Sequence, residues 1–217
     1  MVPGFDISHH NGQIDWTKVV EALKPDPTSI PPGEPYPEGP YGFVFCKATE
    51  GLEYVDPTEQ VDFRGALGAG LITGLYHFFH PTLDPVKQAN HFLSTFDNSL
   101  QVLTAIDMEW ISPVNEWDQL KPLEAARAVQ EFLDTVEFRT HRKPLLYYSP
   151  GFATQYLSSL AMGPYKRWIA SYGSTPPNNY AIWQYSEKGT IPGITPGSLD
   201  LDQFNGTVSD LKALVGM

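Results

Sequence analysis

The sequence predicts an α/β fold in which eight strands close into one barrel, with helices after the first five strands only. Two observations predict it. Near-continuous apolar runs alternate with amphipathic helical patterns through the first two thirds of the 217 residues, as in a parallel sheet covered by helices. In the last third, strand-like runs follow one another through connections too short for a helix. The length suits one α/β domain, so we expect residues 1–217 to fold as a unit.

The predicted strands are short runs rich in Val, Ile, Phe and Tyr. They are residues 3–8, 41–49, 70–79, 103–110, 144–150, 167–172, 181–186 and 199–204.

The predicted helices have recognisable starts. Asp56-Pro57 and Asp84-Pro85 each resemble an N-cap followed by proline at the first helical position. Apolar residues recur at helical spacing over 122–141, and a final helix is expected near 207–215.

Residues 24–40 carry seven of the 20 prolines in the chain, which excludes a regular helix or central strand there. We interpret the segment as an insertion loop. Because it joins the first helix to the second strand, it should lie opposite the carboxyl ends of the strands, where active sites of such barrels form. A polyproline segment that docks a partner is the alternative.

The charge and the single cysteine exclude several function classes. A net charge of −11 argues against binding to nucleic acid or to anionic lipid, and no apolar run approaches the length of a membrane helix. Cys46 lies within an apolar run and is expected to be a buried, unreactive thiol. The first ten residues do not form a secretory signal.

The stretch LTAIDMEW, residues 103–110, carries the main chemical signal. Residues two apart in a strand point to the same side, so Asp107 and Glu109 project together. Ionised carboxylates are poorly tolerated along a buried strand but are accommodated at its carboxyl end, which opens into the active site. A structural ion pair with Lys47 or an arginine is the alternative.

Polar and aromatic residues fall at the ends of other strands too, so at least five strands should contribute residues to the same open end of the barrel. These residues are Asp6, Lys47, Glu50, Tyr76, His77, Tyr147, Tyr148, Asp200 and Asp202. A cleft rich in acids and lined by aromatic rings suits glycoside hydrolysis, in which one carboxyl protonates the leaving oxygen. Clustered carboxylates also separate one another's pKa values, which keeps one of them protonated.

The histidines do not predict a metal site. His9 and His10 are adjacent and so lack the spacing of paired ligands, which favours a structural or substrate-lining role. His77, His80 and His91 form no compact ligand set either. We therefore expect neither a metal nor another cofactor.

With these residues considered, the chain resembles the lysozymes of glycoside hydrolase family 25. The matching motifs run in order through almost the whole sequence: GFDISHHNGQIDW, FVFCKATEG, GLYHFF, AIDMEW, LLYYSP, RWIASY, IWQYS and GSLDLDQFNG. The resemblance implies a single irregular TIM-like (β/α)5β3 barrel. It also implies muramidase activity, the hydrolysis of the β-1,4 bond between N-acetylmuramic acid and N-acetylglucosamine in peptidoglycan.

The resemblance also assigns roles to residues. Glu109 would be the general acid, Asp107 its partner in the Asp-x-Glu pair, and Asp6 and Asp200 the rest of the acidic cluster. The reaction would retain configuration, with the substrate acetamido group as nucleophile supported by Asp107, or with direct attack by an Asp as the alternative. The candidates for substrate contacts are Lys47, Glu50, Tyr76, Tyr148, Trp183, Gln184, Tyr185 and Asp202. Asp202 departs from the family motif, which usually has Asn there.

Two other functions stay open: a chitinase-like glycosidase, and a peptidoglycan-binding module that has lost activity. The residues before Asp107 lack the further acids of the chitinase motif, and the intact acidic cluster argues against lost activity. We expect a monomer that acts on bacterial glycan strands without a separate wall-binding domain. It would reach the wall from a host cytoplasm through a holin lesion, or by secretion with its signal removed.

Overall fold

The computed structural model describes residues 1–26, 28, 39, 41–173, 175–195 and 199–216. Most of the proline-rich segment 24–40, predicted to be an insertion loop, lies outside the described residues. Nine strands form one sheet in the order β1-β9-β8-β7-β6-β5-β4-β2-β3, and β1 also pairs with β2. That last pairing closes eight strands into a barrel, as predicted.

The barrel strands lie close to their predicted positions. They are β1 (Val2–Ile7), β2 (Phe43–Glu50), β4 (Ile72–Phe78), β5 (Leu103–Asp107), β6 (Leu145–Tyr148), β7 (Arg167–Ala170), β8 (Ile182–Gly189) and β9 (Leu199–Phe204). The two-residue strand β3 (Tyr54–Val55) was not predicted; it forms a hairpin with Thr49 and Glu50 at the end of β2.

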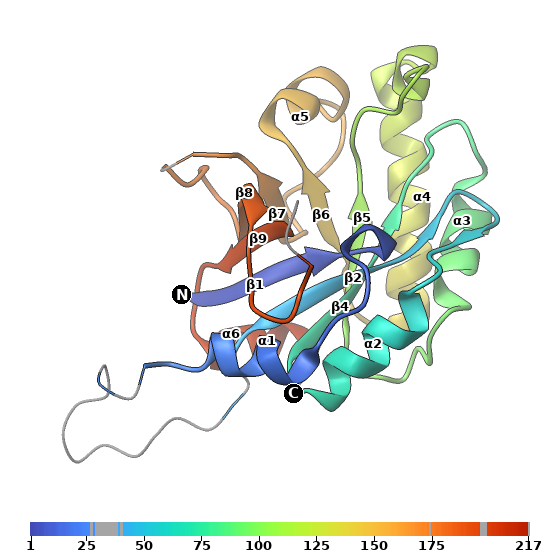
Figure 1. Cartoon of the computed structure of the whole chain (residues 1–217). Helices are drawn as coiled ribbons and strands as arrows, with labels where there is room; N and C mark the ends of the chain where they lie inside the picture. The colour runs from blue at the N-terminus through green and yellow to red at the C-terminus, as the bar shows by residue number, and fades with distance from the viewer. Residues whose placement is uncertain (27, 29–38, 40, 174, 196–198, 217) are drawn as a thin grey trace.

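Each of the first five barrel strands is followed by a helix, which confirms the (β/α)5β3 architecture. The helices are α1 (Trp16–Leu23), α2 (Glu59–Gly68), α3 (Pro85–Leu93), α4 (Pro122–Thr140), α5 (Pro150–Tyr156) and, after β9, α6 (Val208–Val215). Two short 3-10 helices, η1 (His9–Asn11) and η3 (Glu116–Gln119), lie in the connections after β1 and β5. Helices α2, α3 and α4 lie along the β2–β4–β5 side, and among the described residues no helix separates β7, β8 and β9 (Figure 1).

The helix starts show one correct prediction and one error. Asp84 caps α3 by accepting a hydrogen bond from the Lys87 backbone N–H (3.0 Å), with Pro85 at the first position. Asp56 does not cap α2, which begins two residues later than predicted. Its Oδ2 instead accepts from the His9 backbone and contacts His9 Nδ1 at 2.7 Å, so Asp56 anchors the connection after β1.

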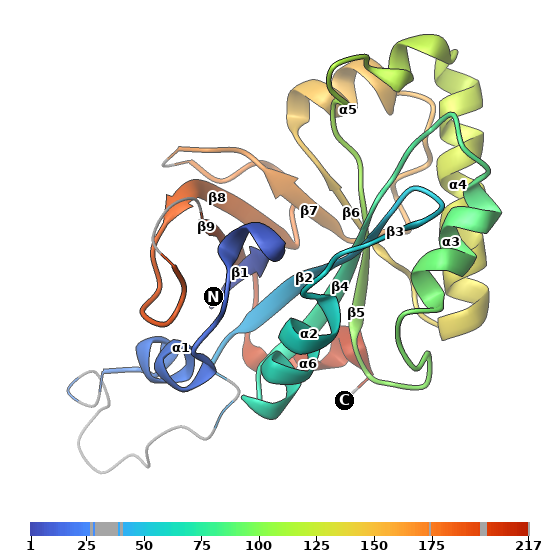
Figure 2. The ribbon, with the colours of Figure 1, turned by 45° about the vertical axis from the view of Figure 1, so that its right-hand side comes forward.

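Two apolar layers sit on either side of the sheet. One lies between strands and helices and includes Cys46, which is buried as predicted and whose thiol pKa is raised by that burial. The other fills the barrel, and Leu211 and Val215 of α6 belong to it, so α6 closes the end opposite the carboxyl ends of the parallel strands (Figure 2). The open end of the barrel is therefore the one where Asp107 lies.

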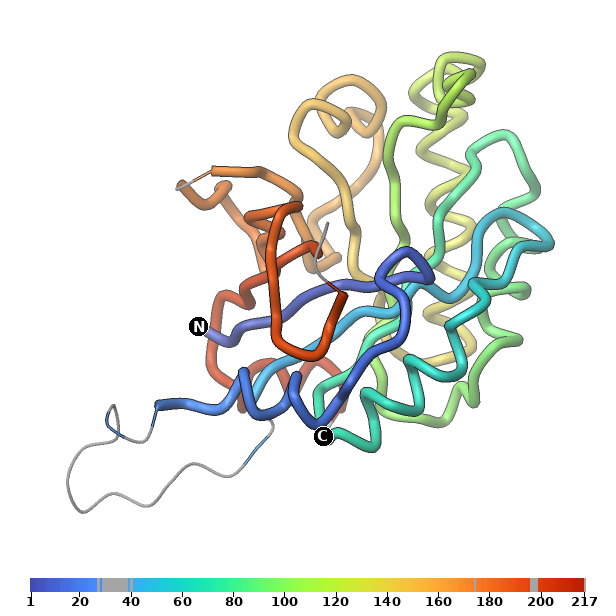
Figure 3. Tube along the Cα trace, in the orientation of Figure 1, coloured from blue at the N-terminus to red at the C-terminus, as the bar shows by residue number. Residues whose placement is uncertain are grey.

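The strands β8 and β9 run antiparallel to each other, and β9 also runs antiparallel to β1. The beginning of β9, not its end, therefore reaches the open mouth of the barrel. Figure 3 shows the segment between β8 and β9 running beside the connection from β1 to α1, where the Asp15 backbone N–H donates to Gly193 O at 2.8 Å. This contact joins the helix-poor side of the barrel to its first βα unit.

Candidate active site

The open end of the barrel holds a small cavity of about 80 Å³ that continues into a cleft of about 510 Å³. The four predicted catalytic residues, Asp6, Asp107, Glu109 and Asp200, all line the small cavity. Asp6 lies in β1, Asp107 and Glu109 lie at and just after the end of β5, and Asp200 lies near the start of β9. Closure of the barrel thus brings together residues that are up to 194 positions apart (200 − 6). The remaining residues that line the small cavity are Tyr76, Tyr147 and Trp168.

Asp107 and Glu109 form the acidic pair that the sequence predicts. Asp107 is the last residue of β5 and is buried, whereas Glu109 lies beyond the strand and is partly exposed. Their carboxyl groups lie close enough to act on each other. Burial raises the pKa of both, and the charge of Glu109 raises that of Asp107 further. Both shifts favour the protonated form of a carboxyl group, which is the form that a general acid requires.

Asp107 also has a free acceptor. Its Oδ1 is buried and has no hydrogen-bond partner within the described part of the chain. A buried oxygen without a hydrogen-bond partner lowers the stability of the folded protein unless a ligand donates a hydrogen bond to it. Asp107 Oδ1 is therefore available to a donor on a bound substrate.

Asp6 is fixed by a hydrogen-bond network at the opposite wall of the cavity. Gln184 Nε2 donates to Asp6 Oδ2 at 2.8 Å, and Gln184 Oε1 accepts from the hydroxyls of Tyr147 (2.9 Å) and Tyr172 (3.1 Å). Burial raises the pKa of Asp6, and the neighbouring carboxylates of Asp202 and Asp200 raise it further. Three elements thus hold one side chain in place.

Asp200 and Asp202 lie at different depths although they share a face of β9. Asp200 is directly opposite Asp6 in the β1–β9 pairing, and burial raises its pKa to about 6. Asp202 pairs with Gly4, deeper in the barrel, where it accepts a hydrogen bond from Trp168 Nε1 at 2.8 Å. Burial raises its pKa to about 8. Asp202 lines neither the cavity nor the cleft, so the structure does not bring it to the substrate.

Lys47 supplies positive charge beside the acidic pair. Its Nζ contacts Glu50 Oε2 at 2.6 Å and lies 5.1 Å from the centre of the Phe78 ring. Its charge opposes the rise in the pKa of both Asp107 and Glu109. The alternative in which Lys47 pairs structurally with Asp107 is not observed, because its ion pair is with Glu50.

Three predicted substrate contacts, Tyr148, Trp183 and Tyr185, line neither the cavity nor the cleft. Tyr148 packs in the layer between sheet and helices, and the adjacent Tyr147 points into the cavity instead. Trp183 contacts the rings of Tyr180 and Tyr185 on the side of β8 away from Gln184, and its indole N–H donates to Ser171 O. Alternation along a strand explains each error, since only every second residue faces the barrel interior.

The cleft also contains residues that sequence reasoning missed. His10 was expected only to be structural or to line a substrate site, and it lies here. The other cleft residues without a prediction are Ile7, Ser8, Asn11, Tyr172, Glu187 and Lys188. Ser8, Asn11 and Tyr172 lie in connections beyond strand ends, where no periodicity marks which residues face the site, whereas Ile7, Glu187 and Lys188 belong to β1 and β8.

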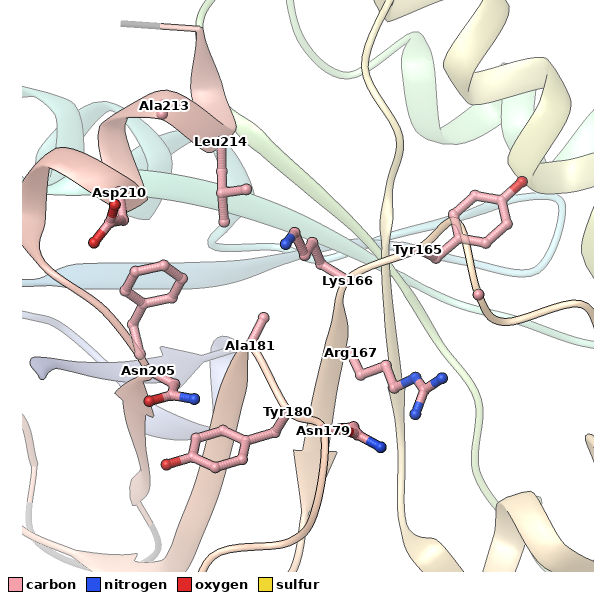
Figure 4. A pocket seen from close by; sticks show the side chains of 12 residues that line it. Tyr165, Lys166, Arg167, Asn179, Tyr180, Ala181, Asn205, Asp210, Ala213 and Leu214 are labelled. Carbon is pink, nitrogen blue, oxygen red and sulfur yellow. The ribbon is translucent and has the colours of Figure 1, made fainter.

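A second cavity, of about 680 Å³, lies at the opposite end of the barrel (Figure 4). Lys166, Arg167 and Tyr180 line it together with residues of α6 and its connection. It contains none of the predicted site residues, and in βα barrels the active site forms at the other end. We therefore place the functional site at the acidic cleft, although it is the smaller space.

Within the described residues, no group of three or more His, Cys, Asp or Glu side chains is arranged to hold a metal ion. No helix in that part of the chain is long and apolar enough to cross a membrane.

Comparison with known proteins gives the same assignment as the motifs. The sequence profile described as Glycosyl hydrolases family 25 matches residues 5–194. An uncharacterized protein of Escherichia coli, YegX, is 32% identical over 99% of this chain and 73% of its own length. An autolytic lysozyme of Clostridium acetobutylicum is 36% identical over 75% of this chain and 48% of its own length.

Among solved structures, a bacterial lysozyme from Streptomyces coelicolor superposes with a TM-score of 0.84 at 28% identity, covering 99% of this chain and 96% of the other. The family profile runs from within β1 to beyond β8 and includes Asp6, Asp107 and Glu109, whereas β9 with Asp200 lies after the matched range. The chain therefore belongs to glycosyl hydrolases family 25.

Proposed function

We propose that this protein is a lysozyme that hydrolyses the β-1,4 bond between N-acetylmuramic acid and N-acetylglucosamine in bacterial peptidoglycan. The observation that carries the proposal is the Asp107–Glu109 pair, which lines a small cavity together with Asp6 and Asp200 beside a wider cleft. Relatives named as lysozymes, among them the autolytic lysozyme and the Streptomyces coelicolor enzyme, support the substrate class.

In the proposed reaction Glu109 acts first as an acid and then as a base. Its carboxyl donates a proton to the glycosidic oxygen as the bond from that oxygen to the sugar C1 breaks. The acetamido oxygen of the same sugar attacks C1, and Asp107 accepts the acetamido N–H. Glu109 then removes a proton from a water molecule that attacks C1, which regenerates the acetamido group and the acid.

Other residues of the site have supporting roles in the proposal. Asp6 and Asp200 provide negative charge near the developing oxocarbenium-like centre. Tyr76 remains a proposed substrate contact, and Tyr147 takes the place of Tyr148. Lys47, Glu50 and Gln184 line neither the cavity nor the cleft, and in the proposal they support the acids that do. All of them belong to one chain, so the reaction requires no second copy, and the site of action is the bacterial cell wall.

Mass spectrometry of purified peptidoglycan after digestion tests the bond assignment. The new reducing ends are labelled by borohydride reduction before the fragments are weighed. We expect reduced N-acetylmuramic acid at the new ends. Reduced N-acetylglucosamine would mean that another bond is cut, and intact glycan from several wall types would favour the inactive binding module.

A further inference from the structure

A chain of four charged side chains leads from a loop at the rim to the catalytic pair. Glu116 Oε1 lies 2.9 Å from His80 Nδ1, His80 Nε2 lies 3.2 Å from Glu50 Oε1, and Glu50 Oε2 lies 2.6 Å from Lys47 Nζ. Lys47 in turn acts on the charges of Asp107 and Glu109. The four residues come from three places: the end of β2, the segment after β4, and η3 in the connection after β5.

The contacts of His80 require that both of its ring nitrogens donate. A carboxylate can only accept hydrogen bonds, and each nitrogen faces one. The imidazole is therefore doubly protonated when both contacts are made. Its side chain is only 17% exposed, so water competes weakly for these hydrogen bonds.

The backbone of His80 and the carboxylate of Glu116 are also held by hydrogen bonds. Gln88 Oε1 accepts from the His80 backbone N–H at 2.9 Å, and Gln88 Nε2 donates to His80 O at 2.8 Å. Thr82 Oγ1 donates to Glu116 Oε2 at 2.5 Å. His80 and Glu116 are thus held in place from both sides, and the imidazole cannot turn away without breaking several contacts.

The other titratable groups around His80 do not replace these carboxylates. His77 of β4 is fully buried, and its pKa is lowered to about 3 by that burial, so it is neutral. His91 Nε2 of α3 donates to the backbone carbonyl oxygen of Tyr54 at 2.9 Å. Lys47 carries positive charge, but Glu50 stands between it and His80. The hydrogen bond to Glu50 raises the pKa of His80 and is also the main reason that the pKa of Glu50 is lowered, to about 2.

We propose that His80 is a positioning residue for the hydrolysis: as an imidazolium it ties η3 to the end of β2 and fixes Glu50, which holds Lys47 against the Asp107–Glu109 pair. The inference rests on the proposed function. It also gives the direction of a pH effect. When the pH rises through the raised pKa of His80, one nitrogen loses its proton, one carboxylate contact breaks, and Lys47 is held less firmly.

The test compares the pH dependence of kcat/KM on solubilised peptidoglycan with the titration of the His80 ring followed by NMR. The informative variant is Glu116→Gln, which keeps the size of the side chain and removes its charge. The matched control is Glu53→Gln, since Glu53 is an exposed acid in the turn after β2 and changes the net charge equally. We expect Glu116→Gln to move the His80 titration and the alkaline limb of activity together to lower pH, by about one unit, and Glu53→Gln to move neither.

A double-mutant cycle separates this role from general loss of structure. His80→Gln cannot donate from two ring nitrogens, so we expect a several-fold lower kcat with little change in KM. Adding Glu116→Gln to His80→Gln should then leave the pH profile unchanged. An alkaline limb that stays in place while the His80 titration moves, or an equal shift in Glu53→Gln, would overturn the inference. A wild type that hydrolyses no peptidoglycan would overturn the proposed function and this inference with it.

Discussion

Asp107 and Glu109 lie two residues apart, but their surroundings give them different properties. Asp107 is 5% exposed and keeps an unpartnered oxygen, whereas Glu109 reaches both the small cavity and the wider cleft. The more accessible carboxyl is the one suited to exchange a proton with a glycosidic oxygen and then with water. The buried one is suited to hold a substrate group in a fixed position.

The assignment of Asp107 can be tested by Asp107→Asn. The amide keeps the shape of the side chain but removes the charge that supports the acetamido group in the proposed reaction. We expect kcat on solubilised peptidoglycan to fall by about 10²-fold or more, with a smaller change in KM. If Asp107→Asn kept near-normal turnover while Asp6→Asn or Asp200→Asn abolished it, the roles of the acids would have to be exchanged.

Asp202 provides a prediction about stability. Its pKa is raised to about 8 by burial, so the folded state holds the proton more tightly than the unfolded chain. The stability that this group provides is complete below its unfolded pKa and is lost as the pH rises through about 8. Asp202→Asn, which can still accept from Trp168 Nε1, should therefore raise the free energy of unfolding, by on the order of a few kcal/mol at pH 8 and little at pH 4.

Chemical unfolding of wild type and Asp202→Asn at several pH values measures this difference. Activity should persist in the variant, because Asp202 lies below the cavity and does not line it. A stability difference that is the same at pH 4 and pH 8 would show that the Asp202 carboxyl titrates normally in the folded protein.

The sequence was most informative about residues whose chemistry conflicts with a buried strand. Asp107 is a charged residue in an otherwise apolar run, and that conflict alone points to a strand end at an active site. Tyr147 and Tyr148 present no such conflict, since either ring can be buried in a core or line a cleft. Their orientation depends on the register of β6, which pairs with β5 and β7, and one sequence does not fix that register.

At the scale of elements, packing of α1 on α2 depends on one glycine. A Cβ added to Gly65 would lie 2.0 Å from Trp16 Nε1, at the first residue of α1. Gly68, one turn along the same helix, has no atom within 4 Å of such a Cβ. The two positions share the helix and differ in their contact with α1.

We expect Gly65→Ala and Gly68→Ala to change stability in opposite directions. Overpacking against Trp16 should destabilise the first variant by about 1–3 kcal/mol. The second should be stabilised by about 0.5–1 kcal/mol, because alanine favours the helix and meets no neighbour. Urea unfolding followed by circular dichroism measures both, and equal effects of the two substitutions would show that the Gly65–Trp16 contact is unimportant.

Helix starts show why local patterns predict some elements and miss others. Asp84-Pro85 and Asp56-Pro57 look alike in the sequence, and only the first caps a helix. Asp56 is recruited by His9, 47 positions away, and its other oxygen accepts from the Thr58 backbone N–H. A tertiary contact of this kind overrides a local preference and has no signature in the local sequence.

At the scale of the whole molecule, the barrel converts dispersed motifs into one site. Local periodicity predicted the eight barrel strands, although not β3, and the change from helical to helix-poor connections. The acids could then be placed at the strand ends. The reversed direction of β9 was not predicted. It places Asp200 at the mouth because it is near the start of the strand, and it places Asp202 inside the barrel because it is farther along.

The site that results is strongly acidic, with Asp6, Asp107, Glu109 and Asp200 around one small cavity and Lys47 as a cation that acts on the pair. Burial raises the pKa of all four acids, and the charge of at least one neighbouring carboxylate, which is Glu187 in the case of Asp200, raises each of them further. A closed barrel keeps these groups together despite their repulsion, because the apolar layers on both faces of the sheet hold the strands in place.

The most direct test of this account measures the new reducing ends released from purified peptidoglycan by wild type and by Glu109→Gln, with circular dichroism to show that the variant is folded. We predict N-acetylmuramic acid ends from the wild type and a rate lower by about 10³-fold in the variant, since glutamine cannot transfer a proton to the leaving oxygen. A folded Glu109→Gln protein that cleaved the glycan at near the wild-type rate would contradict the assignment of Glu109 as the general acid.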